Sequence, residues 1–360
     1  MPTSTAPLVS VVMVIRDVER FVSQAIESIL DQTFRDFEFI IVDFGSTDGS
    51  KHMAASYAAK DKRIQLTEIP RCSYIEAKIS ACSLVHGRYL AIQDADDVSL
   101  PHRLEAEVDF MENHPEVGLL GGAIQRIDQD GKCLSTADKY PADDQEIRSV
   151  LREWSPFCHP AVLILTEAFV RAGGYRVAFT QSDDYDLWLR ISEHYRCANL
   201  QDVIVKYRIH PQQMTIRNRS DQILCTLAAQ ASASLRETGQ PDPINSAKQI
   251  TPALLTQMGV SKAKQKNKLA EGYLSLIRQM YAAGGYASVL EAAEELFRLC
   301  KGERVESKCA SDIHILSAKV HWKQKRILPS FFSLARAVHA RPKIVGRPLI
   351  PFLRRLRSAF

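Results

Sequence analysis

Apolar and polar positions along the first third of the chain follow a pattern typical of strands that alternate with helices. Short apolar runs predict buried strands, and the segments between them carry apolar residues at helical spacing, as Phe21, Ala25 and Ile29 do. The predicted strands are 8–15, 37–42, 64–69, 88–92 and 117–121, and the predicted helices are 18–30, 50–59, 74–85 and 101–113. Such strict alternation predicts an α/β fold, with a mostly parallel sheet and helices on both of its faces.

The pattern changes twice further along the chain. After residue 122 it is less regular: a turn at 128–131, strands at 161–165 and 202–209, and a helix at 186–192 are predicted. Beyond residue 217 it is helical, with helices predicted at 254–269, 273–283 and 289–300 and a glycine pair, 284–285, between the last two. We therefore expect an α/β domain at 1–217 and an α-helical region at 218–360.

Composition narrows the class of protein. The chain has 360 residues, of which 46% are apolar and 24% charged, as in a soluble protein large enough for two domains. Its eight cysteines show neither paired nor zinc-binding spacing, which favours reduced thiols in the cytoplasm. The amino terminus lacks the features of a secretion signal, and the apolar run at 9–15 is too short to span a bilayer.

Positive charge gathers at the carboxyl end. No acidic residue follows Asp312, whereas eleven Lys or Arg do, interleaved with large apolar residues such as Phe331 and Phe332. A basic amphipathic segment of this kind is typical of contact with anionic lipid at the inner face of the plasma membrane. The alternatives are a helical face that packs on its own domain, or a contact with an RNA-like polyanion; we expect no nucleic-acid partner.

Three aspartates follow the strand predicted at 88–92. Asp94, Asp96 and Asp97 would therefore lie at the carboxyl edge of the sheet, where open α/β folds bind ligands. Clustered carboxylates repel one another unless a cation lies between them, and oxygen ligands favour Mg²⁺ or Mn²⁺ completed by phosphate oxygens. On an extended chain Asp94 and Asp96 would project to one side and Asp97 to the other. A helix cap is the structural alternative, but one cap needs one aspartate.

Other polar residues offer further candidates. Asp43 ends the second predicted strand and leads into a glycine-containing turn, where it either binds a nucleoside or only forms the turn. Asp183 and Asp184 precede a predicted helix. They are either a general base and its neighbour, or acids that cap the helix. His159 and His210, each followed by proline, are metal or phosphate ligands or structural hydrogen-bond formers.

Taken together these segments resemble the family 2 inverting glycosyltransferases with the GT-A fold, over residues 9–215. The residues that carry the resemblance, in the order that the family shows, are Ser10-Val11-Val12-Met13, Ser28-Ile29-Leu30-Asp31-Gln32-Thr33-Phe34, Val42-Asp43-Phe44-Gly45-Ser46-Thr47-Asp48, Gly87-Arg88-Tyr89, Asp94-Ala95-Asp96-Asp97, His159-Pro160, Gly173-Gly174-Tyr175, Asp183-Asp184-Tyr185-Asp186-Leu187-Trp188 and Tyr207-Arg208-Ile209-His210.

The resemblance implies a GT-A-type, Rossmann-like sheet and a sugar transfer from a nucleoside-diphosphate sugar to the hydroxyl of a glycan or glycolipid, with inversion. It implies Asp184 as the catalytic base and Mn²⁺ or Mg²⁺ as the cofactor. Substrate contacts are expected from Asp43, Asp94, Asp96, Asp183, Lys78, Arg16 and His159, and metal contacts from Asp96, Asp97 and His210.

The chain departs from the family pattern where the nucleotide base should bind. Phe44 stands where an acid often follows Asp43, and the usual Ala-Arg-Asn of the third helix reads Ala77-Lys78-Ile79. Arg16 lies where a tyrosine is usual, although its guanidinium plane can stack on a base. The alternative function is therefore an inactive relative that binds a partner or a membrane. Nucleotidyl transfer is disfavoured because no glycine-rich loop follows the first strand.

Overall fold

The computed structural model describes residues 6–134, 136–210, 218–282, 286–300 and 307–342. By their internal contacts these residues form two compact units, one of residues 1–218 with 228–250 and one of 219–227 with 251–360. The domain division expected at residue 217 thus lies near the unit boundary, but residues 228–250 pack with the sheet.

The first unit is built around one eight-stranded sheet. Its strand order is β3-β2-β1-β4-β7-β6-β8-β5, in which the first four strands are mutually parallel and β7 and β5 run antiparallel to their neighbours. The strands are β1 (Val9–Ile15), β2 (Phe37–Asp43), β3 (Ile64–Glu68), β4 (Tyr89–Ile92), β5 (Val98–Ser99), β6 (Val117–Ile127), β7 (Val162–Leu165) and β8 (Arg196–Arg208). The prediction of a mostly parallel sheet is confirmed.

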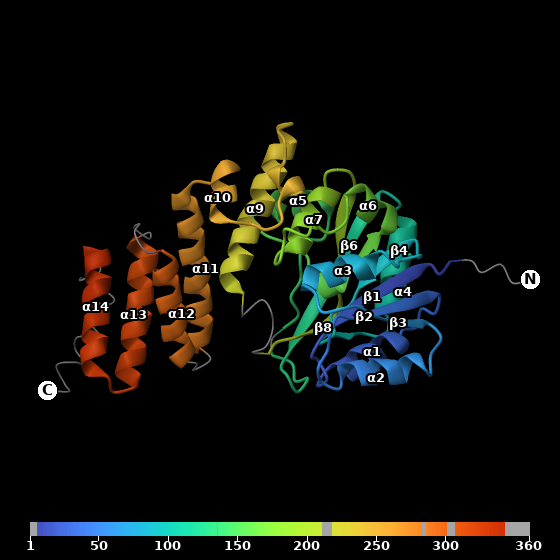
Figure 1. Ribbon diagram of the computed structural model, residues 1–360, viewed down its shortest axis with the longest axis horizontal. Coiled ribbons are helices and arrows are strands. Elements are labelled where there is room, and N and C mark those ends of the chain that lie inside the picture. The colour runs from blue at the N-terminus through green and yellow to red at the C-terminus, as the bar shows by residue number, and fades with distance from the viewer. Residues whose placement is uncertain (1–5, 135, 211–217, 283–285, 301–306, 343–360) are drawn as a thin grey trace, which may run out of the picture. The chain divides into compact units, whose positions relative to one another are not determined.

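Helices cover both faces of this sheet, as predicted (Figure 1). Alternate residues of β1, such as Val11 and Met13, pack in one apolar core with residues of α1, α2 and α4, whereas α3 packs on β1 and β2 without joining that core. The helices of this unit are α1 (Val22–Leu30), α2 (Ser50–Ala58), α3 (Tyr74–Cys82), α4 (Arg103–Asn113), α5 (Asp144–Leu151), α6 (Thr166–Arg171), α7 (Asp183–Ile191) and the short η1 (His159–Ala161) and η2 (Pro243–Ser246).

The second unit consists of helices. Its members are α10 (Pro252–Gln257), α11 (Lys262–Ala282), α12 (Tyr286–Leu299), α13 (Ser307–Lys323) and α14 (Ile327–Ala340), and α9 (Arg219–Glu237) belongs partly to each unit. An apolar core of α11, α12 and α13 residues holds this unit together. None of the helices in the described ranges is long and apolar enough to cross a membrane.

Two predictions about this unit were wrong. The helix expected at 254–269 is divided, because Gly259 adopts a φ of 84° and ends α10. Such a left-handed glycine closes a helix at little cost, since it has no Cβ to clash with the backbone. The break expected between residues 269 and 273 does not occur, and α11 runs through it. The glycine pair 284–285 lies outside the described residues.

Candidate active site

The three aspartates after β4 lie in a turn and not on an extended chain. The amide of Asp97 donates to the carbonyl of Asp94 at 3.3 Å, which closes the turn. The expectation that Asp94 and Asp96 project together and Asp97 opposite therefore fails, because it assumed strand geometry. Instead each of the three carboxylates has a different partner, and each serves a different part of the site.

Asp97 is the most deeply buried of the three, with 1% of its surface exposed. One carboxylate oxygen accepts the backbone N–H of Arg208, at the end of β8, at 2.6 Å. The other is buried without a hydrogen-bond partner among the described residues. Burial raises the pKa of Asp97 well above its usual range, the charges of Asp96 and Asp94 add to the rise, and Arg208 opposes it. A buried carboxylate oxygen with no donor is a site where a cation would be stabilised.

Asp96 pairs with the second histidine predicted from the sequence. The Nε2 atom of His210 lies 2.8 Å from a carboxylate oxygen of Asp96, and both side chains are largely buried. Carboxylate oxygens and an imidazole nitrogen form a donor set that Mn²⁺ or Mg²⁺ accepts. In the described part of the chain, however, no three His, Cys, Asp or Glu side chains stand close enough to hold an ion by themselves. These oxygen and nitrogen donors fit a cation whose remaining coordination positions are filled by a bound substrate.

Arg208 ties this turn to the surrounding loops. The residue is 2% exposed. Its guanidinium donates to the backbone carbonyls of Asp96, Asp128 and Gln129, at 2.7, 3.2 and 3.3 Å respectively. The same group contacts the side chain of Gln24 on α1 at 2.6 Å. One buried cation therefore links the aspartate turn, the predicted turn at 128–131 and helix α1.

Asp94 faces the other predicted histidine. Its carboxylate lies 3.4 Å from Nδ1 of His159 and 3.5 Å from the hydroxyl of Tyr74, and the opposite nitrogen of His159 lies 3.0 Å from the hydroxyl of Tyr175. Burial would raise the pKa of Asp94, but the charge of His159, its hydrogen bond and the charge of Lys78 lower it. His159 is thus oriented on both sides of its ring, by a carboxylate and by a phenol.

Lys78 and Asp183, both predicted to contact substrate, form an ion pair with each other. Only 6% of the Lys78 side chain and 11% of the Asp183 side chain are exposed, and the ammonium also lies 4.5 Å from the ring centre of Tyr175. Burial would lower the pKa of Lys78, but the charge of Asp183 and the hydrogen bond to it raise it above its usual value. The pair joins α3 to the beginning of α7, and the charges of both partners act on the next residue, Asp184.

Asp184 is half-buried in the first turn of α7. One of its oxygens accepts the N–H of Tyr185 at 2.7 Å. Burial raises the pKa of Asp184 and the charge of Asp183 adds to the rise, whereas His159, Lys78 and the Tyr185 N–H oppose it. A carboxylate with a raised pKa is a stronger base than an exposed one, which suits a group that must accept a proton.

The two acidic groups of the sequence converge on one place. Burial raises the pKa of the Tyr74 phenol well above its usual range, and the charges of Asp94, Asp183, Asp96 and Asp184 each add to that rise. Charges act on a group in this way only when they are near it. The aspartate turn after β4 and the acids of α7 therefore lie near one another, around Tyr74.

Asp43 ends β2 at the same edge of the sheet. One oxygen accepts the N–H groups of Gly45 and Ser46 at 3.0 and 3.1 Å, so the turn-forming role is present, and the other oxygen is buried without a hydrogen-bond partner among the described residues. Beside it the guanidinium of Arg16 lies 4.5 Å from the ring centre of Phe44, which is 3% exposed. Asp43, which matches the family pattern, thus lies beside Arg16 and Phe44, which depart from it.

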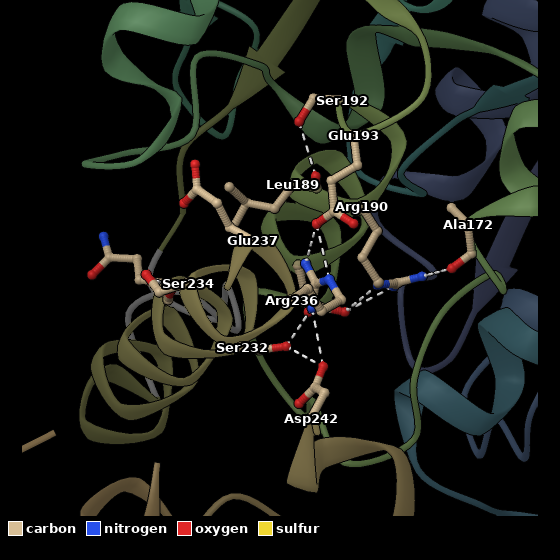
Figure 2. A network of polar contacts seen from close by, with 12 residues as sticks. Ala172, Leu189, Arg190, Ser192, Glu193, Ser232, Ser234, Arg236, Glu237 and Asp242 are labelled. Carbon is tan, nitrogen blue, oxygen red and sulfur yellow. Dashed lines mark hydrogen bonds and ion pairs between the residues drawn. The ribbon is translucent and has the colours of Figure 1, made fainter. Parts of the chain in front are cut away.

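Asp186 has a structural role, distinct from that of its neighbours. Its fully buried carboxylate is held by Arg176 and by Arg190, with the latter at 2.8 Å. Arg176 also contacts Asp242 at 2.7 Å. Arg236 of α9 bridges Asp242 and Glu193 at 3.0 and 2.7 Å (Figure 2). This network, the α7 clamp, fixes the helix that carries Asp184 to residues 228–250, on the far side of the predicted domain boundary.

Two site residues were absent from the predicted set. Tyr175 was part of a recognised glycine-glycine-tyrosine segment but received no role; positive φ angles at Gly173 and Gly174, 80° and 61°, turn the chain so that Tyr175 reaches His159. Tyr74 carried no signal in the sequence, since a tyrosine in the first turn of a helix is commonplace.

Comparison with known proteins identifies the family. A sequence model described as "Glycosyl transferase family 2" matches residues 10–171. EpsE of Bacillus subtilis (strain 168) is 35% identical over 210 residues, which cover 57% of this chain and 74% of EpsE. The O-antigen biosynthesis glycosyltransferase WbnJ of Escherichia coli is 32% identical over 211 residues, 56% of this chain and 80% of WbnJ.

A solved structure shares the fold across most of the chain. TarS 1–349 of S. aureus in complex with UDP-GlcNAc superposes with a TM-score of 0.53 at 15% identity, covering 91% of this chain and 90% of that one. At this identity the likeness shows the fold alone, which agrees with the expected GT-A-type sheet followed by helices. By its sequence relatives and its fold, this chain belongs to glycosyl transferase family 2.

Proposed function

We propose that this protein is an inverting glycosyltransferase that moves a sugar from a nucleoside-diphosphate sugar to a hydroxyl of a growing cell-surface polysaccharide or glycolipid. The observation that carries the proposal is that the aspartate turn after β4 and the start of α7 meet around Tyr74: Asp94 lies 3.5 Å from its hydroxyl, and Lys78, paired with Asp183, lies 5.2 Å from its ring centre. WbnJ acts in O-antigen biosynthesis and TarS has been solved with UDP-GlcNAc, which supports a polysaccharide product and a nucleotide-sugar donor for this chain.

The donor would lie at the carboxyl edge of the sheet. Asp43 and Asp94 offer acceptors for ribose or base donors, and Arg16 offers a flat cation for stacking. Asp96, Asp97 and His210 would hold Mn²⁺ or Mg²⁺, which when bound stabilises negative charge on the leaving diphosphate. His159 and the Lys78–Asp183 pair would bound the sugar side of the cleft.

Asp184 would act as the general base. Its carboxylate takes the proton of the acceptor hydroxyl as that oxygen attacks the anomeric carbon, and the bond from this carbon to the diphosphate breaks, with its electron pair going to the diphosphate oxygen. Attack from the face opposite the leaving group inverts the anomeric configuration. The raised pKa of Asp184, caused first by burial, suits it to accept a proton in the transition state.

The first test is donor binding. In a thermal-shift screen of nucleoside diphosphates with and without Mn²⁺, at least one diphosphate should raise the melting temperature, and more so with Mn²⁺, since stabilisation scales with the logarithm of ligand over dissociation constant. The metal-dependent part of the shift should vanish in Asp97→Asn. If no diphosphate stabilises the protein, an inactive relative becomes the better description. The Arg16–Phe44 stack at the expected base position favours that alternative.

The second test is catalysis. Asp184→Asn should lower the rate of donor hydrolysis or sugar transfer by about 10²–10⁴-fold, the usual contribution of a general base, while donor binding stays intact. The matched control is Asp202→Asn, which changes an exposed aspartate in the same unit. Equal activity of wild type and Asp184→Asn would remove Asp184 from the mechanism.

We further propose that the enzyme works in the cytoplasm, at the inner face of the plasma membrane.

A further inference from the structure

Helix α14 presents its large apolar residues to solvent. Ile327, Leu328, Phe331 and Phe332 are 50%, 71%, 61% and 62% exposed, and they account for four of the ten exposed large apolar residues in the described part of the chain. The spacing i, i+1, i+4 and i+5 puts all four on one side of the helix. Exposed apolar residues that occur singly need no explanation, but a contiguous group marks a contact surface. We call these four residues the α14 face.

The opposite side of α14 holds the helix in its unit through three small residues and one leucine. Ser330, Ser333, Leu334 and Ala337 are buried, and the hydroxyl of Ser330 donates to the carbonyl of Ala318 on α13 at 2.9 Å. A helix stabilised only within its own domain buries its large apolar residues and exposes its small and polar ones. Here Leu334 is buried while the four large residues of the α14 face are exposed, so that face is available for another contact.

Cations surround the α14 face. Lys325 and Arg326 immediately precede the helix, Arg336 lies on its exposed side and Arg341 follows it; all four are exposed, and none has an ion-pair partner among the residues the structure describes. The sequence contains no acidic residue after Asp312 that could neutralise them. Large apolar residues flanked by unneutralised cations are the pattern of a helix that lies in the interface of an anionic bilayer.

Charge separates the three occupants that this face could have. A second copy of the chain would bring its own Arg326 and Arg336 against the same residues, and like charges repel. Residues 343–360 carry five further Lys or Arg and no acid, so they would add to the positive charge instead of balancing it. A bilayer with anionic headgroups offers negative charge and an apolar interior together.

We propose that α14 docks this protein on anionic lipid, with Ile327, Leu328, Phe331 and Phe332 inserted below the headgroups and Lys325, Arg326, Arg336 and Arg341 at headgroup level. This identifies the surface behind the membrane location put forward under Proposed function. Lipid docking can be tested independently of the enzymatic assignment, because the donor is proposed to bind at the sheet and not at α14.

The test is co-sedimentation of the full chain with vesicles. Wild type should bind vesicles of phosphatidylcholine mixed with phosphatidylglycerol and should bind pure phosphatidylcholine weakly, since each cation near an anionic surface contributes about fivefold to binding. Leu328→Ser/Phe331→Ser/Phe332→Ser should abolish binding, and Arg326→Gln/Arg336→Gln should weaken it roughly twenty-fivefold. The matched control, Val170→Ser, changes an apolar residue of the sheet unit that is 68% exposed and should bind as wild type does.

Two results would overturn the proposal. The first is wild-type vesicle binding that is absent, or that survives the triple serine change. The second is a wild-type dimer in light scattering that the triple change converts to a monomer, because a second copy would then be the occupant. A nucleoside-diphosphate thermal shift, measured on each variant, confirms folding: it should be unchanged by the α14 substitutions. Its absence in wild type would count against the enzyme but not against lipid docking.

Discussion

Replacing Lys78 with methionine would isolate the buried charge of Asp183. Methionine keeps the length and apolar stem of the side chain, so its packing against Tyr175 is retained while the ammonium is lost. Because 6% of the Lys78 side chain and 11% of the Asp183 side chain are exposed, the remaining carboxylate would have little water to compensate it. Removing one partner of a buried pair costs about 3–5 kcal/mol, and we expect Lys78→Met to lose that much stability.

The assay is urea unfolding at neutral pH, followed by tryptophan fluorescence, to which the fully buried Trp188 of the same unit contributes. The midpoint should fall with the slope unchanged. Because the folded-state pKa of Lys78 is raised, its contribution is complete below the ordinary value of 10.5 and fades as the pH rises through the raised one. The gap between wild type and Lys78→Met should therefore hold at neutral pH and close only in alkali.

A double variant supplies the control. Lys78→Met/Asp183→Leu removes both charges, and a buried ion pair replaced by apolar residues is often no less stable than the original. The double variant should therefore recover most of the lost stability. If it is as unstable as Lys78→Met alone, or if Lys78→Met unfolds at the wild-type midpoint, the reasoning from an unpaired buried carboxylate is refuted. Activity gives a separate readout: without Lys78 the pKa of Asp184 should rise, which moves the acid limb of the pH–rate profile to higher pH.

Three further predictions concern other parts of the site. Asp97→Asn should stabilise the metal-free protein by roughly 0.5–2 kcal/mol, as relief of a strained functional site commonly does, and thermal melts should show the gain shrinking toward acid pH, where the wild-type carboxyl is neutral as well. Arg16→Ala should weaken nucleoside-diphosphate binding by about 1 kcal/mol, near fivefold in calorimetry, if its guanidinium stacks on the base; unchanged affinity would leave it paired only with Phe44. Asp242→Ala should cost about 3 kcal/mol in urea unfolding by leaving Arg176 without one of its carboxylates, and an undiminished midpoint would show that the α7 clamp is not stabilising.

The sheet and the acidic residues could be predicted from sequence because both produce local signals. The strands β1, β2 and β4 are buried on both faces, and β3, at the edge of the sheet, buries Ile64 alone; all four are bounded by turn residues, and their carboxyl ends meet by topology. Helix α5 was not predicted, because its apolar face is only two turns long. Its N-cap was nevertheless visible in the sequence: Asp143 accepts from the N–H of Glu146. Strand β8 begins at Arg196, well before the predicted start, because its first half alternates polar residues such as Asn199 whose burial depends on other segments.

Contacts between distant residues were beyond reach of the pattern. Nothing in the sequence shows that Lys78 and Asp183, predicted separately as ligand contacts, would meet each other, since they stand 105 positions apart in the chain. The same holds for the turn at Asp94–Asp97, where the amide-to-carbonyl bond and Arg208 override the extended geometry that a preceding strand suggests. Such pairings depend on tertiary packing, which short-range periodicity does not encode.

Arg208 makes one attachment of the 128–131 loop independent of that loop's side chains. It holds the loop and the aspartate turn through their main-chain carbonyls, at Asp96, Asp128 and Gln129. Every residue type supplies a carbonyl, so a change of side chain at Gln129 or Asp130 leaves these hydrogen bonds in place. The shape of the loop itself depends on Asp128, whose carboxylate accepts the N–H groups of Asp130 and Lys132 at 2.9 Å, and on the positive φ of Gly131. Sequence variation at the middle of the loop is therefore compatible with a fixed aspartate turn, whereas variation at its two ends is not.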